Sequence, residues 1–373
     1  KRALKVVSIG SKESIAVDKL KAEFVKVAPG QEAAAIASQK LTNSSVILVG
    51  ERAAESAGAL SAVAALVDST GAKLAWIPRR AGERGAIEAG AIGNLLPGGR
   101  PVTDAAARVD IAAVWNTDSI PSEVGRSTAQ IIDAVNAGQL GALLVGGVDP
   151  LDADNSQAAL AALDKAFVVS LEITHSAVTA VADVVLPVAA VIEKSGSFQD
   201  WQGSTRVFEK AISDSLSRSD VRILSMIADE MGTPINLPTV AATAREIAAL
   251  GNWDGEAVVF EKVSSVKNVS TEEKMNLTSW RLLLDLGTLQ DGEANLAGTA
   301  RKASARISKT RAEKIGVSEG ELISISSDLG SLKLPVEISE MSDNDIWVPR
   351  NSIDSQVIAN LGFVSGQVTV VKA

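Results

Sequence analysis

Short apolar runs alternate with alanine-rich stretches along the first half of the chain. Apolar runs that end at glycine or proline are typical of buried strands, and the stretches between them have the composition of helices. Continuously apolar strands that alternate with helices indicate a parallel sheet covered on both faces. We therefore predict a doubly wound α/β domain with strands at 4–9, 46–49, 74–77, 111–115, 143–145, 167–171 and 184–186, and helices at 32–40, 53–66, 128–137 and 156–164.

The pattern changes in the second half. Two further helices are predicted at 219–231 and 239–250, followed by a polar, irregular connection over 251–279. Strand-like alternation with short turns then indicates an all-β barrel or sandwich of about 100 residues, with strands at 322–326, 332–338, 346–349 and 368–371. We accordingly expect two domains, a mostly parallel α/β domain over 1–270 and a smaller β-barrel domain over 271–373.

Composition excludes several kinds of chemistry. Among 373 residues there is no cysteine and one histidine, so this sequence offers no thiolate nucleophile, no cysteine-ligated cluster and no multi-histidine metal site. A net charge of −9 argues against a broad nucleic-acid surface. The longest uncharged apolar stretches, at 57–67 and 184–192, are shorter than the ~20 residues of a membrane span. Because a predicted strand begins almost at Lys1 and no signal peptide is visible, we expect a fragment of a larger protein.

Glycines follow three predicted strands, where a doubly wound sheet often binds phosphate. The segments are Gly10-Ser11-Lys12, Gly50-Glu51-Arg52 and 146–150. None of them matches the dinucleotide fingerprint or the P-loop. We interpret the first two as turns that let the chain leave the sheet. The third, Gly146-Gly147-Val148-Asp149-Pro150, is a better candidate for lining a crevice.

A carboxylate, two glycines and an arginine follow the strand at 184–186. Glu193 and Arg206 can pair across one loop there, with Gly196 and Gly203 permitting the turns. Two interpretations remain open, a self-stabilised surface loop and a segment that lines a cofactor.

Two segments concentrate positive charge. Arg79, Arg80 and Arg84 come just after a predicted strand, where they either contact a partner or form a solvated turn with Glu83. The stretch Arg301–Lys314 holds six basic residues against one acid, and is either a solvated face or a docking site for an acidic neighbour.

The single histidine, His175, lies shortly after the predicted strand at 167–171, which is a functional position in such folds. No cluster of acidic or metal-binding residues lies near it in the sequence, so we interpret it as structural or solvated rather than catalytic.

Three neighbouring motifs resemble the molybdopterin oxidoreductase superfamily. They are ADVVLP at 182–187, EKSGSF at 193–198 and WQGSTR at 201–206, preceded by the strand-end loop at 146–150. The segment 312–323 resembles the opening of the superfamily's final barrel domain. The segments 76–86 and 93–101 are similar to one branch, the large iron–sulfur subunit of bacterial NADH-quinone oxidoreductase, or respiratory complex I, in its actinobacterial form.

This resemblance implies a function within a larger assembly. In that branch the iron–sulfur clusters lie in a cysteine-rich N-terminal portion, and the molybdopterin-like portion supports the electron path without binding molybdenum. The chain would then be a cofactor-free scaffold without catalytic or metal-binding residues of its own, in an enzyme that transfers electrons from NADH to quinone. The implied partners are the flavin-containing, NADH-binding subunits and the connecting subunits of the peripheral arm, on the cytoplasmic side of the membrane, with no nucleic acid and no direct membrane span.

The sequence also departs from the catalytic members of the superfamily. Gln202 stands where their motif has glutamate, and no cysteine is present to bind molybdenum. Two alternatives therefore stay open, the C-terminal part of a molybdopterin enzyme such as a formate dehydrogenase, and an adaptor that retains the fold without redox work. The resemblance transfers no catalytic residue. It implies only the walls of a relic cleft, for which the candidates are Gly146, Asp149, Glu193, Gly203 and Arg206.

Overall fold

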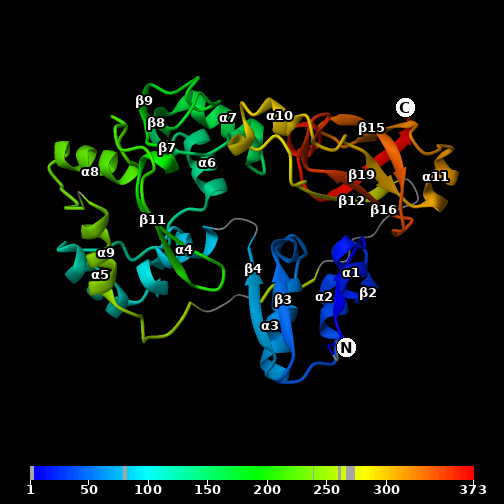
Figure 1. The fold of residues 1–373 in the computed structure, drawn as a ribbon, viewed down its shortest axis with the longest axis horizontal. Coiled ribbons are helices and arrows are strands. Elements are labelled where there is room, and N and C mark those ends of the chain that lie inside the picture. The colour runs from blue at the N-terminus through cyan, green and yellow to red at the C-terminus, as the bar shows by residue number, and fades with distance from the viewer. Residues whose placement is uncertain (1–3, 79–81, 238, 259–261, 266–273) are drawn as a thin grey trace. The chain divides into compact units, whose positions relative to one another are not determined.

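The computed structural model describes residues 4–78, 82–237, 239–258, 262–265 and 274–373, and it divides the chain into two compact units (Figure 1). Unit 1 comprises Lys1–Trp76, Leu151–Ser156 and Glu261–Ala373, and unit 2 comprises Ile77–Pro150 and Gln157–Phe260. The predicted domain boundary at residue 270 stays a prediction. It was placed where the fold type changes from α/β to all-β, whereas the two units are defined by how closely their residues pack together.

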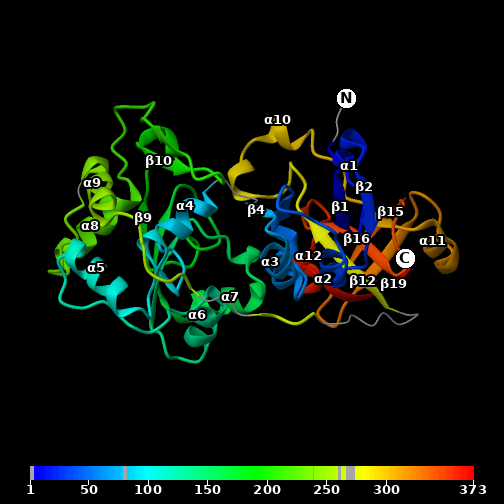
Figure 2. The same cartoon turned by 90° about the horizontal axis from the view of Figure 1, so that it is seen from below.

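Unit 1 begins with short parallel strands and helices. β1 (Val7–Gly10) pairs in parallel with β2 (Glu23–Lys26), with α1 (Ile15–Leu20) between them. β3 (Val46–Gly50) and β4 (Lys73–Ile77) form a second sheet. The remaining elements of this segment are α2 (Glu32–Ala37), the 3₁₀ turn η1 (Glu51–Glu55) and α3 (Ala59–Thr70). The helices α2 and α3 pack against each other (Figure 2).

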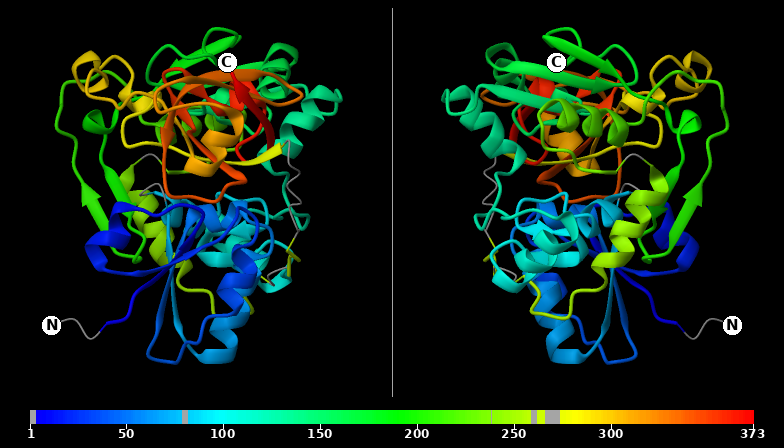
Figure 3. Two further views of the ribbon diagram at one scale, coloured as in Figure 1. Left: turned by 90° about the vertical axis from the view of Figure 1, so that its right-hand side faces the viewer. Right: turned by 90° about the vertical axis from the view of Figure 1, so that its left-hand side faces the viewer.

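The second part of unit 1 is a closed six-stranded barrel with the strand order β12-β16-β13-β15-β14-β19. Its strands, coloured yellow to red, are seen from two sides in Figure 3. β12 pairs in parallel with β16 and antiparallel with β19, and β14 closes the ring between β15 and β19. The strands are β12 (Lys274–Trp280), β13 (Ala305–Ile307), β14 (Leu322–Ser326), β15 (Ser331–Ile338), β16 (Asp345–Pro349) and β19 (Gly366–Lys372).

A continuous apolar core fills this barrel. It includes Leu277, Ile307, Ile323 and Ile346, all of which are fully buried. Short elements decorate the barrel: η5 (Thr288–Gln290), α10 (Ala294–Ala297), α11 (Lys309–Ile315), β17 (Asn351–Ser352), β18 (Ser355–Gln356) and α12 (Val357–Leu361). The predicted α/β architecture followed by a smaller barrel is therefore confirmed.

Unit 2 is built around a three-stranded parallel sheet in the order β7-β8-β9. An apolar cluster around Val135, Leu163 and Val168 packs on this sheet, and a second cluster joins Leu171 to Ile223. The elements are α4 (Glu83–Glu88), β5 (Leu95–Leu96), η2 (Pro97–Gly99), β6 (Arg100–Pro101), α5 (Ala105–Trp115), α6 (Thr128–Asn136), β7 (Ala142–Gly146), η3 (Pro150–Asp152, largely in unit 1), α7 (Ser156–Lys165), β8 (Phe167–Glu172), β9 (Val184–Pro187), η4 (Val191–Glu193), β10 (Gly196–Gln199), β11 (Thr205–Phe208), α8 (Asp220–Glu230) and α9 (Val240–Leu250).

Three sequence-based expectations were wrong in detail. The apolar run at 111–115 is the end of helix α5, because Asp104 caps this helix by accepting the Ala107 N–H at 2.9 Å and alanines fill its first turn. The connection predicted over 251–279 contains strand β12 of the barrel from Lys274 onward. Within the described residues the predicted strands also lie in separate short sheets rather than in one continuous sheet.

Candidate functional site at the strand ends

The carboxyl ends of β7 and β8 meet at one edge of the unit 2 sheet. Gly146 is in register with Leu171, and the N–H of Gly147 donates to the Leu171 carbonyl at 3.2 Å. Gly147 has a φ of 61°, so glycine is favoured where the chain leaves the sheet. Open α/β sheets bind ligands at this edge. Gly146 and Asp149 therefore lie where a ligand crevice was expected.

Glu193, another residue predicted to line the cleft, uses its carboxylate to stabilise its own loop. Its carboxylate accepts the Ala190 N–H at 2.8 Å and the Ser215 hydroxyl at 2.7 Å. These two hydrogen bonds, that from Ser215 first, hold the pKa of Glu193 below its usual value. The expected ion pair between Glu193 and Arg206 does not form, because the carboxylate is already used to fix this turn.

Gly203 lies in the turn of the β10–β11 hairpin. The turn is closed by Asp200, whose carboxylate accepts the N–H groups of Gln202 and Ser204, both at 2.9 Å. Gly203 adopts a φ of 89°, which explains the glycine. Sequence reasoning did not identify Asp200, although an Asp two residues before a Gln-Gly pair is a recognisable turn signal.

Arg84 of α4 holds the same hairpin turn. Its guanidinium donates to the Trp201 carbonyl at 3.3 Å, and a Cβ on Gly203 would lie 3.1 Å from it. The sequence left two interpretations open for Arg84, contact with a partner and a solvated turn. Its side chain is partly exposed, but it is engaged within this unit. Arg79 and Arg80 lie outside the described residues.

Arg206 lies on β11 in register with Phe198, whose ring stacks on Phe208 with centroids 5.1 Å apart. The Arg206 side chain is exposed on this hairpin. Within the described part of the chain, no hydrogen bond or ion pair joins any two of Gly146, Glu193, Gly203 and Arg206. The predicted cleft residues therefore occupy turns and a hairpin without converging on one atom position.

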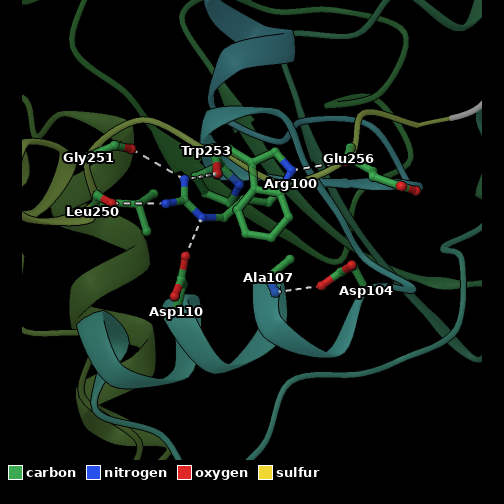
Figure 4. A network of polar contacts seen from close by, with 9 residues as sticks. Arg100, Asp104, Ala107, Asp110, Leu250, Gly251, Trp253 and Glu256 are labelled. Atoms are coloured by element: carbon green, nitrogen blue, oxygen red, sulfur yellow. Dashed lines mark hydrogen bonds and ion pairs between the residues drawn. The ribbon is translucent and has the colours of Figure 1, made fainter.

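A buried arginine in unit 2, which sequence reasoning missed, donates hydrogen bonds to the end of α9 (Figure 4). Arg100 is 1% exposed and donates to the carbonyls of Leu250 at 2.9 Å and Gly251 at 3.3 Å. Its Nε donates to Asp110 at 3.2 Å, and its guanidinium lies over the Trp253 ring at 5.5 Å. Because these carbonyls end α9, Arg100 stabilises the C-terminus of that helix. Its sequence signal is weak, a lone arginine between two glycines and a proline.

In unit 1 the strand-end cations meet two tryptophans of the barrel. The Arg52 guanidinium lies 4.2 Å from the Trp280 ring centre, and Lys12 Nζ lies 4.9 Å from the Trp347 ring centre. The two ring centres are 5.0 Å apart, and the Arg306 guanidinium lies 4.9 Å from the Trp347 ring centre. We call Arg52, Trp280, Lys12, Trp347 and Arg306 the tryptophan stack.

A buried carboxylate lies on the same strand as Trp347. Asp345 is fully buried and accepts the Asn276 amide at 3.0 Å. Burial, the largest effect, raises the pKa of Asp345 to about 6, while the hydrogen bonds from Asn276 and Ser342 lower it. The charges that act on it are Glu32, which raises its pKa, and Lys26, which lowers it.

The basic stretch Arg301–Lys314 is not one continuous surface. Arg306 pairs with Glu337 at 2.9 Å, and Arg311 is buried and donates to the Asp343 carbonyl at 2.8 Å. These two arginines stabilise the barrel, so they do not add to a docking face. The exposed basic residues of the stretch are Arg301, Lys302, Lys309 and Lys314.

His175 is exposed in the loop after β8. The described residues give it neither a hydrogen bond nor an ion pair, and no group of three or more acidic or histidine side chains in the described part of the chain could hold a metal ion. This arrangement fits the interpretation of a solvated histidine.

Comparison with known proteins places these features in a family. The family model of molybdopterin oxidoreductases matches residues 1–230. Because this match covers more than half of the chain, and the strand-end loops and the closing barrel have the expected order, the chain belongs to the molybdopterin oxidoreductase family.

Its relatives narrow the similarity to one branch. The chain is 45% identical over 368 residues to the G subunit of the NADH-quinone oxidoreductase of Mycobacterium tuberculosis, covering 95% of this chain and 46% of the relative. The same subunit of Streptomyces coelicolor is 46% identical over 329 residues, covering 86% and 39%. Formate dehydrogenase H of Escherichia coli is 31% identical over 159 residues, covering 41% and 22%. The chain thus spans less than half the length of each of these curated relatives.

The family implies a molybdopterin cofactor, an anionic group that needs cationic and backbone donors. At the unit 1 strand ends, Lys12 and Arg52 already stack on barrel tryptophans. At the unit 2 strand ends, Glu193 adds negative charge and serves its own turn. One hollow of about 310 Å³ lies along α6. The described side chains therefore do not form a cradle that fits this cofactor.

Proposed function

We propose that the chain is the cluster-free structural part of the large iron–sulfur subunit of an NADH-quinone oxidoreductase. In this role it supports electron transfer from NADH to quinone without performing a chemical step itself. The observation that carries the proposal is the 45% identity to the mycobacterial G subunit over 95% of the chain. A relationship this extended includes both the α/β segments and the barrel, so it is more than a shared motif.

The proposal includes the absence of a cofactor in this part of the protein. Iron–sulfur clusters would be held by the cysteine-rich portion of a longer parent subunit, since this chain contains no cysteine. The engagement of Lys12, Arg52 and Glu193 by neighbouring groups supports a relic cleft without molybdenum. The enzymatic activity would then belong to the assembled complex.

The expected partners are the other subunits of the peripheral arm, namely the flavin-containing, NADH-binding subunits and the connecting subunits, on the cytoplasmic side of the membrane. None of the described helices has the length and apolarity to cross a bilayer. Contact surfaces would include Arg79 and Arg80 and the exposed basic residues of the stretch Arg301–Lys314, which suit an acidic neighbour.

A segment replacement tests this proposal. The homologous part of the large iron–sulfur subunit of an actinobacterial NADH-quinone oxidoreductase is exchanged for this chain, and the purified membranes are assayed for complex assembly and for NADH-dependent quinone reduction. We expect assembly and a substantial share of the wild-type activity. A complex that lacks the subunit, while the replaced subunit is expressed and folded, would contradict the proposal.

Two other functions are weaker. A molybdopterin enzyme such as a formate dehydrogenase is supported by weaker similarity, with 31% identity over 41% of the chain for one such relative and 23% over 76% for another, against 45% over 95% for the mycobacterial NADH-quinone oxidoreductase subunit. An adaptor without redox work would show no association with flavin-containing or quinone-reducing subunits. Affinity purification of the parent protein, followed by a flavin and iron assay of what is retained, separates this adaptor from a complex I subunit.

A further inference from the structure

The strand ends of β1 and β3 present the groups that a phosphate would use. Each strand ends at a glycine, and a cationic side chain follows two residues later, Lys12 after Gly10 and Arg52 after Gly50. Carboxyl ends of parallel strands are the usual ligand edge of an open α/β sheet. What these two cations contact therefore decides whether the two strand ends are available to a ligand.

Both cations contact tryptophan rings of the barrel. Arg52 lies over Trp280, and Lys12 lies over Trp347 and also within 5.9 Å of the Trp280 ring centre. A cation over an indole face is attracted by the ring electrons, most strongly when the pair is partly removed from water. Trp347 is 3% exposed, so the Lys12 contact lies in such an environment.

The barrel strand that carries Trp347 is buried on both faces. Ile346 and Val348 point into the barrel core, and Asp345 and Trp347 alternate with them on the outer side, yet every residue of β16 is buried. Part of the cover is Lys12, which also forms an isolated antiparallel bridge with Met341, just before β16.

A second contact also holds the segment after β3 against the barrel. Arg350, directly after β16, donates to Glu55 of η1 at 2.6 Å and to the Ser279 carbonyl of β12 at 2.7 Å. The loops after β1 and β3 thus contact both β12 and β16 of the barrel.

We infer that the loops after β1 and β3 are closed against the barrel, an arrangement that we call the closed joint, in which Lys12 and Arg52 hold Trp280 and Trp347 instead of binding a phosphate-bearing ligand. The inference concerns unit 1 alone, and it stands whether or not the chain belongs to an NADH-quinone oxidoreductase. It identifies which side chains account for the misfit with the family's cofactor.

The test combines thermal melting with tryptophan fluorescence on the full chain. The double variant Lys12→Met, Arg52→Gln removes both cations and keeps most of the side-chain volume. We expect it to lower the melting temperature by about 2–4 °C and to shift the tryptophan emission. The matched control Lys19→Met, Arg245→Gln changes two exposed cations outside the stack and should leave both readings unchanged.

Ligand binding is measured on the same proteins with inorganic pyrophosphate and with GDP as probes. Up to millimolar concentrations, the closed joint predicts no saturable change in emission or melting temperature of the wild-type chain. Saturable stabilisation of the wild-type chain by either probe, lost in the Lys12→Met, Arg52→Gln variant, would overturn the inference. An unchanged melting temperature and emission of that variant would overturn it as well.

Discussion

At the residue scale, the buried carboxylate of Asp345 gives this protein a defined pH dependence. Its folded pKa of about 6 exceeds the ordinary value of 3.8, because burial disfavours the charged form. Between about pH 4 and 6 the unfolded chain loses this proton before the folded chain does. The free energy of unfolding therefore falls as pH rises through this window and stays lower above it.

The first prediction follows from this sign. Asp345→Asn keeps an acceptor for the Asn276 amide and removes the charge, so at pH 7.5 it should raise the free energy of unfolding by about 2–3 kcal/mol. Urea unfolding at pH 7.5 and pH 4 measures the effect, which should be several-fold smaller at the lower pH. The control is Asp328→Asn at an exposed position. A loss of stability at pH 7.5 would show that the charged form is needed.

Arg100 is the opposite case to Asp345, because its buried charge is stabilised by an ion pair with Asp110 and by hydrogen bonds to backbone carbonyls. Truncation in Arg100→Met would leave the carbonyls of Leu250 and Gly251 without their donor. We expect unit 2 to lose about 3 kcal/mol or more in urea unfolding. Arg245→Met on the exposed surface of α9 is the control and should change stability by less than about 0.5 kcal/mol. Equal effects of the two substitutions would contradict the assigned role.

At the scale of elements, the β10–β11 hairpin depends on one glycine and one arginine. Gly203→Ala places a Cβ at a φ of 89° and 3.1 Å from the Arg84 guanidinium, so it should destabilise the turn by about 1–2 kcal/mol. Hydrogen exchange of the hairpin amides measures this. Gly50→Ala is the matched control, since a Cβ there meets nothing within 4 Å.

A double-mutant cycle with Arg84→Ala separates the two causes of that loss. If the Cβ of residue 203 disturbs the guanidinium, the two substitutions should couple by about 0.5 kcal/mol or more. Strict additivity would mean that backbone strain alone accounts for the effect.

The elements also show what the sequence can and cannot predict. Strand β14 was predicted with its bounds, because Ile323 and Ile325 face the core and serines alternate with them. Strand β12 was missed although Met275 and Leu277 alternate with polar residues and face the barrel core, because this alternation is short and directly follows a polar stretch. The run at 111–115 was misread, because a short apolar run fits a strand and a helix equally well.

The candidate site was predicted less well than the fold. The glycines at the strand ends were found, since turn chemistry is local. The partners of Glu193, Arg84 and Arg52 were not, because each lies far away in sequence or on another element. A charged residue in a loop looks the same in sequence whether it awaits a ligand or stabilises its own fold.

At the scale of the whole molecule, assembly experiments test which surfaces of the chain contact other subunits. Because Arg84 already binds the β10–β11 hairpin, only Arg79 and Arg80 are changed, in the double variant Arg79→Glu, Arg80→Glu. We expect this variant of the parent subunit to show several-fold lower incorporation into the complex, while the melting temperature of the isolated chain changes by less than about 2 °C. A matching fall in melting temperature would indicate a structural role instead.

We propose above all that this member of the molybdopterin oxidoreductase family is a structural part of a redox complex and holds no molybdenum. The most direct measurement is the elemental content of the purified parent complex by mass spectrometry, as molybdenum and iron per protein. The account predicts several iron atoms per complex and molybdenum far below one atom per subunit. One molybdenum atom per subunit would contradict it and favour a catalytic molybdopterin enzyme.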